Sequence, residues 1–196
     1  MRCPELDWEI RTSYGKGYNL QMNKVEREQL TEIIEADNGT NWWQPVLFEE
    51  KIRSQLPTDL KIISVPPNPA GNFNCFAYAL GLENDKEFLG GQNPIQKEFI
   101  RYLLNKRILG IIEKPSVGDL VFYENEEGVI THGGIVQDDG SILSKWMWGA
   151  LFAHKLWDVP SSFGDTAFYT KAPDSRLVKQ TYAEYRDSGV QIDPIT

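Results

Sequence analysis

The sequence predicts an α+β protein, in which helices precede a set of antiparallel strands. Apolar residues recur at helical spacing over much of residues 23–105, whereas short β-rich runs separated by turn residues fill residues 115–170. Of the 196 residues, 41% are hydrophobic and 24% are charged, a composition typical of a globular domain with a buried core. We expect residues 1–60 to form an N-terminal helical region, as a small lobe, and residues 61–196 to form the core that carries the chemistry.

The N-terminal region is expected to hold two helices and to lead into a strand. Asn23 and Glu26 match a capping box at the start of the first helix, and Asp-Asn-Gly at residues 37–39 ends it. A second helix is expected over residues 46–55, and residues 60–65 fit a short strand. The prolines that follow force an extended segment, which delivers the chain to its central motif.

The central motif changes from turn chemistry to a compact apolar run that ends at a glycine. We expect a short helix from Cys75 to Leu80, with Asn72 or Asn74 as its N-cap and Gly81 as its stop. The free N–H groups and the positive end of the helix dipole would favour a thiolate at Cys75. The alternative is an inert cysteine that packs as a small core hydrophobe.

After this motif the sequence predicts one longer helix and then a change to strands. Asn93 is the expected N-cap of that helix, Pro94 its first residue, and Gly110 its end. Asp-Asp-Gly at residues 138–140 is a hairpin signal between two of the strands. The expected strands lie at residues 120–123, 129–137, 142–146, 152–156 and 167–170, and a terminal helix is expected at 174–185.

Charge and composition exclude several classes of partner. The net charge of −8 and the pI near 4.9, without a basic stripe, argue against nucleic acid and anionic membranes. No apolar run is long enough to span a membrane, and residues 1–9 are acidic where a signal peptide is apolar. We therefore expect a cytoplasmic protein, with delivery as an effector left open. Cys3, Cys75, His132 and His154 lack the close spacing of a zinc site, so no metal or other cofactor is expected.

Three motifs follow one another in an informative order. They are Asn-Cys-Phe-Ala-Tyr-Ala-Leu at residues 74–80, Gly-Asp-Leu-Val-Phe-Tyr at 118–123 and Thr-His-Gly-Gly-Ile-Val at 131–136. In this order they resemble the NlpC/P60 superfamily of papain-like cysteine peptidases and amidases, over roughly residues 70–146. The resemblance implies a papain-like core, in which a small antiparallel sheet packs on the helix that carries the nucleophile. Cell-wall enzymes of the family usually have Asp and small residues around the nucleophile, so no peptidoglycan substrate is implied here.

The resemblance implies that Cys75 is the nucleophile and His132 the base. An imidazole within about 3 Å of the sulfur would hold a thiolate–imidazolium pair, and the N–H of Cys75 would help to stabilise an oxyanion. The family usually orients its histidine with a third polar residue on the next strand. Ser144 falls at that place and His154 is the alternative, and the sequence leaves both open.

We therefore expect a thiol-dependent hydrolase of peptide or isopeptide bonds, acting on a peptide or protein substrate. Tyr78, one turn after Cys75, and Trp146 are the expected substrate-binding residues, with core packing as their other role. One alternative is a catalytically inactive papain-like fold that acts as a binding or regulatory protein. The other is a deamidase or acyltransferase toxin that uses the same Cys–His site.

Overall fold

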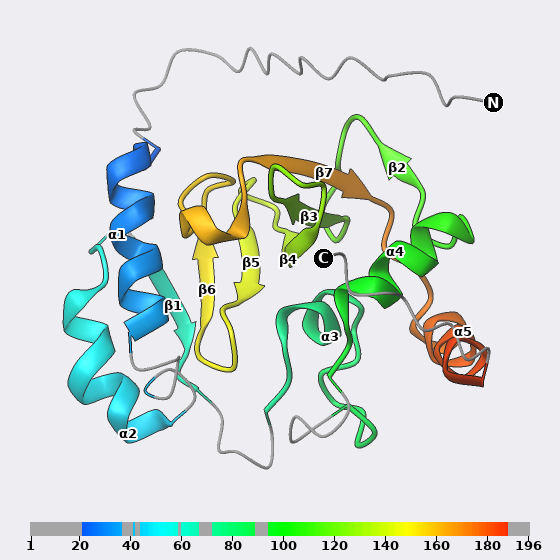
Figure 1. Ribbon diagram of the computed structural model, residues 1–196, viewed down its shortest axis with the longest axis horizontal. Coiled ribbons are helices and arrows are strands. Elements are labelled where there is room, and N and C mark those ends of the chain that lie inside the picture. Colours follow the sequence, from blue (N-terminus) through cyan, green and yellow to red (C-terminus); the bar gives the residue numbers. More distant parts are fainter. Residues whose placement is uncertain are drawn as a thin grey trace.

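A seven-stranded antiparallel sheet forms the middle layer of the molecule, and helices cover both of its faces (Figure 1). The structure is a computed structural model that describes residues 21–36, 41, 44–58, 60–66, 72–88 and 94–187. The strand order is β1-β6-β5-β4-β3-β7-β2. The chain therefore has the expected α+β architecture, with its longest strand, β4, at the centre of the sheet.

The described helices and strands alternate in the order that follows. The helices are α1 (Lys24–Glu35), α2 (Pro45–Leu47), η2 (Phe48–Ile52), η3 (Arg53–Gln55), α3 (Cys75–Ala79), α4 (Lys97–Asn105), η6 (Ser161–Phe163) and α5 (Ser175–Asp187). The strands are β1 (Lys61–Ser64), β2 (Ile111–Ile112), β3 (Leu120–Glu124), β4 (Ile130–Val136), β5 (Ile142–Lys145), β6 (Leu151–His154) and β7 (Thr166–Thr170).

The start of α1 confirms the expected capping box. The side chain of Asn23 accepts a hydrogen bond from the N–H of Glu26, whose carboxylate accepts one from the N–H of Asn23. Leu30 and Ile34 on the inner face of α1 are almost completely buried. The expected helix over residues 46–55 is present as the continuous segments α2, η2 and η3, of which η2 is wider than an α-helix.

The helix expected between Asn93 and Gly110 is shorter than the sequence indicated. It begins at Lys97, with Gln96 at the N-cap position and no side-chain capping bond, and it ends at Asn105. Arg107 then takes a positive φ of 58°, which breaks the helical path before Gly110 is reached. The expected cap at Asn93 lies outside the described residues.

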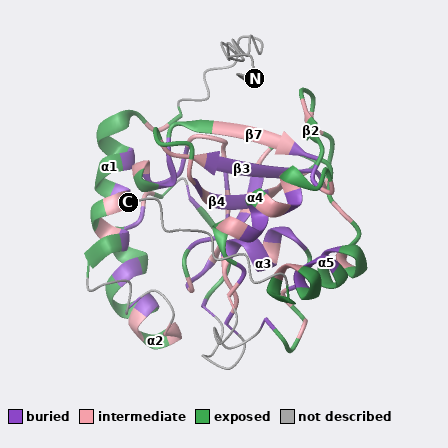
Figure 2. Cartoon of the chain, turned by 45° about the vertical axis from the view of Figure 1, so that its right-hand side comes forward, coloured by how far each residue is buried: buried purple, intermediate pink, exposed green. Residues whose placement is uncertain are grey.

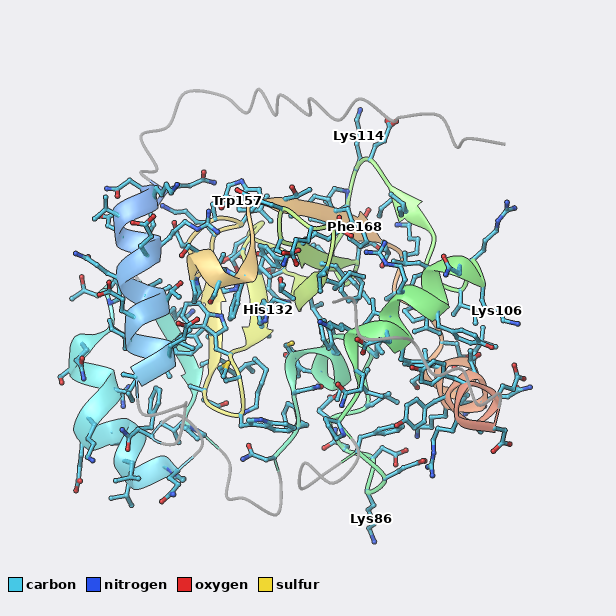
Figure 3. The ribbon with its side chains drawn as sticks, viewed as in Figure 1. Lys86, Lys106, Lys114, His132, Trp157 and Phe168 are labelled. Atoms are coloured by element: carbon cyan, nitrogen blue, oxygen red, sulfur yellow. The ribbon has the colours of Figure 1, made fainter. Side chains whose placement is uncertain are left out.

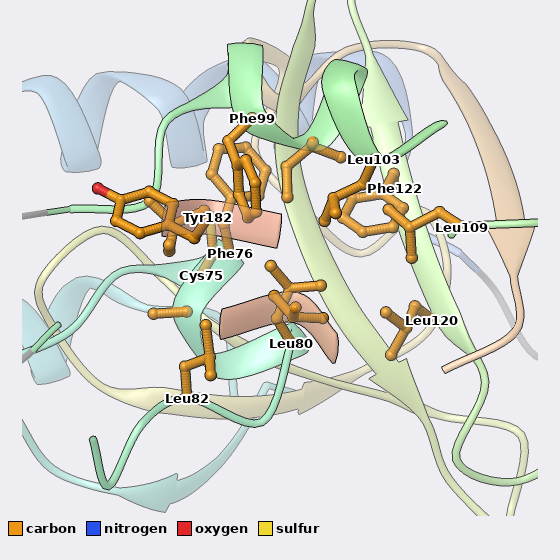
Figure 4. Packing of buried hydrophobic residues seen from close by; sticks show 14 of the residues in the cluster. Cys75, Phe76, Leu80, Leu82, Phe99, Leu103, Leu109, Leu120, Phe122 and Tyr182 are labelled. Carbon is orange, nitrogen blue, oxygen red and sulfur yellow. The ribbon is translucent and has the colours of Figure 1, made fainter. Parts of the chain in front are cut away.

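Two hydrophobic cores lie on the two faces of the sheet, because successive strand residues face opposite sides. Val121 and Tyr123 of β3 belong to the first core, together with residues of α1, η2 and η6. Leu120 and Phe122 belong to the second core, together with residues of α3, α4 and α5. Figure 2 shows α1 on one side of the sheet and α4 and α5 on the other, and Figure 4 shows the second core around Phe99 and Phe122. The N-terminal helices therefore share a core with the sheet.

The strands β4 and β5 separate at one end. Their paired residues are Ile135 with Leu143 and Val136 with Ile142, next to the hairpin that joins the two strands. β5 instead continues its pairing with β6 through Lys145. The part of β4 that holds Thr-His-Gly-Gly thus lies beside an opening in the sheet, and α3 packs there.

Candidate functional site

Cys75 is the first residue of α3, as the sequence predicts. The side chain of Asn74 caps this helix by accepting a hydrogen bond from the N–H of Ala77 at 2.9 Å, so the N-cap is Asn74 and not Asn72. The amide of Asn74 also donates to the carbonyl of Ile95 at 2.7 Å, which ties the start of α3 to the segment before α4. Cys75 is only 8% exposed.

The sulfur of Cys75 reaches the opening between β4 and β5. Val136 accepts a hydrogen bond from Gly118 and donates one to Asp119, so its backbone groups point to the β3 side. Because alternate residues of a strand direct their backbone groups to opposite edges, Gly133 directs its N–H to the β5 side. That N–H interacts with the Cys75 sulfur.

Cys75 holds a neutral thiol in this arrangement. Burial raises the pKa of Cys75 to about 12, although the backbone N–H groups of Gly133, Phe76 and Cys75 itself act in the opposite direction. Desolvation is thus stronger than the combined effect of the helix start and the strand N–H. A reactive thiolate requires either a nearby cation or a more open state.

His132 directs its imidazole to the first core, one residue along β4 from the glycine that contacts Cys75. It pairs with Tyr123 of β3, and its ring stacks on Phe163 with 3.9 Å between ring centroids and 14° between ring planes. His132 is 1% exposed, and its Nε2 has no hydrogen-bond partner within the described parts of the chain. Burial, followed by the nearby His154, holds the pKa of His132 well below its usual value. Figure 3 shows His132 near the middle of the molecule.

The expected thiolate–imidazolium pair is not formed in the state that the structure describes. His132 Nε2 is unpartnered, and both Cys75 and His132 are neutral at pH 7 according to the directions of their pKa shifts. The backbone nevertheless brings the two residues to the same place, because Cys75 contacts the N–H of the residue that follows His132. The groups of a Cys–His site are thus assembled around Gly133 without being hydrogen-bonded to each other.

Ser144 and His154, the two alternatives for the third catalytic residue, bond to each other. Ser144 Oγ lies 2.7 Å from His154 Nε2, and Trp146 Nε1 donates to the same Oγ at 3.0 Å. His154 Nδ1 lies 2.7 Å from the carbonyl of Lys155, which fixes the proton on Nδ1 and leaves Nε2 to accept from the serine hydroxyl. Burial lowers the pKa of His154 to about 4, so this buried network is uncharged.

The two expected substrate-binding residues are placed differently. Trp146 is completely buried and packs on Phe152 with 4.3 Å between ring centroids, so it is part of the core and does not face an open cleft. Tyr78 is partly exposed and stacks on Phe73 at 6.0 Å. Burial, followed by the carboxylate of Glu83, raises the pKa of Tyr78 to about 12. Tyr78 can therefore face a ligand, whereas Trp146 supports the site through Ser144.

Lys145 is a further residue near the site, and the sequence gave it no role. It follows Ser144 on β5 and therefore faces the other side of the sheet, where its Nζ lies 5.0 Å from the ring centroid of Phe73. Lys145 is 2% exposed, and its Nζ donates to the carbonyl of Gly149. Burial lowers the pKa of Lys145 to about 7. A lysine between serine and tryptophan was the available signal, since an inward-facing lysine breaks the apolar pattern of a buried strand.

Other kinds of site were searched in the same residues. The described ranges contain no group of three or more His, Cys, Asp or Glu side chains that could hold a metal ion. Among the described helices, none combines the length and the apolar character that crossing a membrane requires. A cavity of about 370 Å³ lies against α1 and is lined by residues that include Met22, Leu30 and Asp158, and by none of the four catalytic candidates.

One family model matches the chain. It is described as a domain of unknown function, DUF7689, and it covers residues 67–171, more than half of the chain. The matched stretch includes Cys75, His132, Ser144 and His154. Neither the comparison with curated proteins nor that with solved structures gives a match.

Proposed function

We propose that this chain, which belongs to the DUF7689 family, is a thiol-dependent hydrolase of peptide or isopeptide bonds. The observation that carries the proposal is the position of Cys75 at the start of α3, against the N–H of Gly133 and beside the unpartnered imidazole of His132. A buried imidazole nitrogen without a partner is unusual, because most buried polar groups are hydrogen-bonded. It is available to a thiol or to a substrate that enters the site.

The proposed reaction begins when His132 takes the proton of the Cys75 thiol. The thiolate attacks the amide carbonyl, and the carbonyl oxygen becomes an oxyanion for which the N–H groups of Cys75 and Gly133 are the nearest donors. The imidazolium then gives its proton to the leaving amine, and a thioester remains on Cys75. Water, deprotonated by His132, hydrolyses the thioester and releases the carboxylic acid and the thiol.

This mechanism requires the imidazole to move from its stacked position toward the sulfur. Such a movement is local, because His132 and Gly133 are neighbours on β4 and the strand itself can stay in place. We infer that the described state is a resting state with both groups neutral, and that the reactive pair forms when the site opens. The buried Ser144–His154 pair would then orient the imidazole from the adjacent strands.

The second candidate is a non-catalytic papain-like protein that binds a partner. It is favoured by the nearly complete burial of Cys75 and His132 and by their neutral state. In this alternative the two residues are part of the cores, and Ser144 and His154 stabilise the sheet without taking part in any reaction.

A peptide vinyl sulfone separates the two candidates, because it forms a stable thioether only with an activated cysteine. The probe is incubated at pH 6.5 with the full chain carrying Cys3→Ser, and the adduct is measured by intact mass spectrometry. We expect one adduct in the parent and none in Cys75→Ser or in His132→Ala. An absent adduct in the parent, or an equal one in His132→Ala, would show that the Cys–His pair does not exist and would favour the binding protein.

A further inference from the structure

The loop of residues 159–165 lies across His132. Phe163, the last residue of η6, presents its ring to the imidazole with 14° between the two planes. The same ring meets Trp146 edge-on at 5.9 Å between centroids, so it lies between the two polar parts of the site. The hydroxyl of Thr131, the residue before His132, donates to the carbonyl of Phe163. This loop therefore holds the imidazole in its buried position.

Arg27 of α1 holds this loop in place. Its Nε donates to the carbonyl of Val159 at 2.9 Å, and its Nη2 donates to the carbonyl of Gly164 at 2.6 Å. Its Nη1 makes an ion pair with Asp165 at 2.6 Å. Arg27 is only 8% exposed, so these bonds form in a largely desolvated environment, where charge-assisted bonds are strong.

A second residue of α1 binds the same loop. The hydroxyl of Thr31, one turn after Arg27, lies 2.9 Å from the hydroxyl of Ser161 and accepts a hydrogen bond from the N–H of Ser162 at 3.1 Å. The inner face of α1 thus contacts the loop at both of its ends. A loop fixed in this way follows α1, and the imidazole follows the loop.

We propose that α1 regulates the Cys–His site through residues 159–165, which keep the imidazole of His132 stacked on Phe163 and away from Cys75 until the loop is released from Arg27. This inference rests on the proposed function, because it assigns a role to the N-terminal helical region in that same site. The ionisable groups that surround the imidazole are Tyr123 of β3, His154 of β6 and the Cys75 thiol. None of them is charged in the described state, so release of the loop is the event that changes the environment of His132.

Gly164 offers a way to release the loop without removing a contact. Its φ is 102°, and an added Cβ would overlap the backbone carbonyl of Glu124 at the end of β3. Gly164→Ala therefore has to push the loop away from the sheet. Gly140 is a matched control, because it also has a positive φ, of 78°, and an added Cβ there meets nothing within 4 Å.

The test is an NMR titration of the histidine Cε1–H signals in the full chain. The chain has two histidines, and His132→Gln identifies which signal belongs to His132. In the parent and in Gly140→Ala we expect the His132 signal not to titrate between pH 5 and pH 8. In Gly164→Ala we expect it to titrate near pH 6.5, the ordinary value for an exposed histidine. Thermal unfolding of the same samples confirms that the variants are folded.

Phe163→Leu is the second variant, because it removes the stacked ring and leaves the backbone of the loop unchanged. It should also restore a titration of His132. A His132 signal that behaves as in the parent in folded Gly164→Ala and in folded Phe163→Leu would overturn the proposal. This readout does not depend on the reactivity of Cys75. An imidazole that titrates without any vinyl sulfone adduct would thus reject the hydrolase, whereas an unchanged imidazole would reject the role of the loop.

Discussion

Ser144 Oγ and His154 Nε2 are joined by a 2.7 Å hydrogen bond inside the first core. Both side chains are buried, and the serine hydroxyl also accepts the indole N–H of Trp146. The serine is thus the centre of a short chain of bonds that runs from β5 to β6. Because the network lies beside His132, the stability of the sheet and the state of the site depend on the same few polar groups.

Ser144→Ala is expected to be strongly destabilising, because it leaves both the Trp146 N–H and His154 Nε2 buried without a partner. Each unsatisfied group costs about 1–3 kcal/mol, so we expect a loss of about 2–4 kcal/mol in the free energy of unfolding. Urea unfolding followed by tryptophan fluorescence measures this loss. Ser116→Ala is the control, because Ser116 is exposed and bonds Asp119 through its backbone. A loss below about 0.5 kcal/mol in Ser144→Ala, the range of ordinary surface substitutions, would contradict the network.

The protein should lose stability as the pH falls from 6.5 to 4. The pKa of His154 is about 4 in the folded chain and 6.5 in the unfolded chain, so the unfolded chain binds the proton first. The contribution is fully present above pH 6.5, and about 3 kcal/mol of it is lost by pH 4. His132 acts in the same direction.

Urea unfolding at pH 7.5 and at pH 4.5 measures this dependence. The difference between the two pH values should be smaller in His154→Gln than in the parent, because glutamine does not titrate. An equal difference in the two proteins would mean that His154 is not a buried neutral group.

Lys145 should oppose folding near neutral pH. Its pKa is about 7 in the folded chain, compared with 10.5 for an ordinary lysine, so it favours folding at high pH and loses that effect as the pH falls through 7. Relative to Lys145→Met, the parent should lose up to about 3 kcal/mol of stability between pH 9.5 and pH 7. Guanidinium unfolding at these two pH values measures the change. A parallel pH dependence in parent and variant would place the Lys145 amine in contact with water.

The two glycines after His132 should differ in their tolerance of a side chain. A Cβ on Gly134 would lie 2.7 Å from a methyl carbon of Ile142 and 3.0 Å from the carbonyl of Leu143. A Cβ on Gly133 would lie 3.1 Å from the ring of Phe122. Gly134→Ala should therefore cost about 1–3 kcal/mol through overpacking, and Gly133→Ala should cost less. Thermal unfolding of both variants gives the order, and a reversed order would contradict the register of β4.

Much of the fold could be predicted from the sequence, because its signals are local. The capping box at Asn23, the short helix at Cys75 and the hairpin at residues 138–140 depend on neighbouring residues, and all three are present. The two-residue strand β2 was missed, since a pair of isoleucines carries no periodicity. The early end of α4 was missed because the reversal occurs at Arg107, a residue that rarely takes a positive φ.

The site was harder to predict, because its geometry depends on contacts between distant parts of the chain. Parity along β4 separates His132 from the face that packs on α3, and only the register of the sheet reveals this. The bond between Ser144 and His154 joins two strands, so the sequence could present them only as alternatives. Arg27 lies more than 130 residues from the loop that it binds, and nothing in its local pattern distinguished it from an exposed helical arginine.

The measurement that tests the Cys–His site most directly is the pH dependence of Cys75 alkylation by iodoacetamide, in Cys3→Ser and in Cys3→Ser/His132→Ala. A thiol with a pKa of about 12 supplies almost no thiolate at pH 6–7, so any reaction there must come from molecules in which the imidazole has taken the proton. We expect a slow reaction in Cys3→Ser that titrates below pH 8, and the loss of this component in His132→Ala. Identical profiles in the two proteins, with a rate that only begins to rise above pH 9, would contradict a catalytic pair of Cys75 and His132.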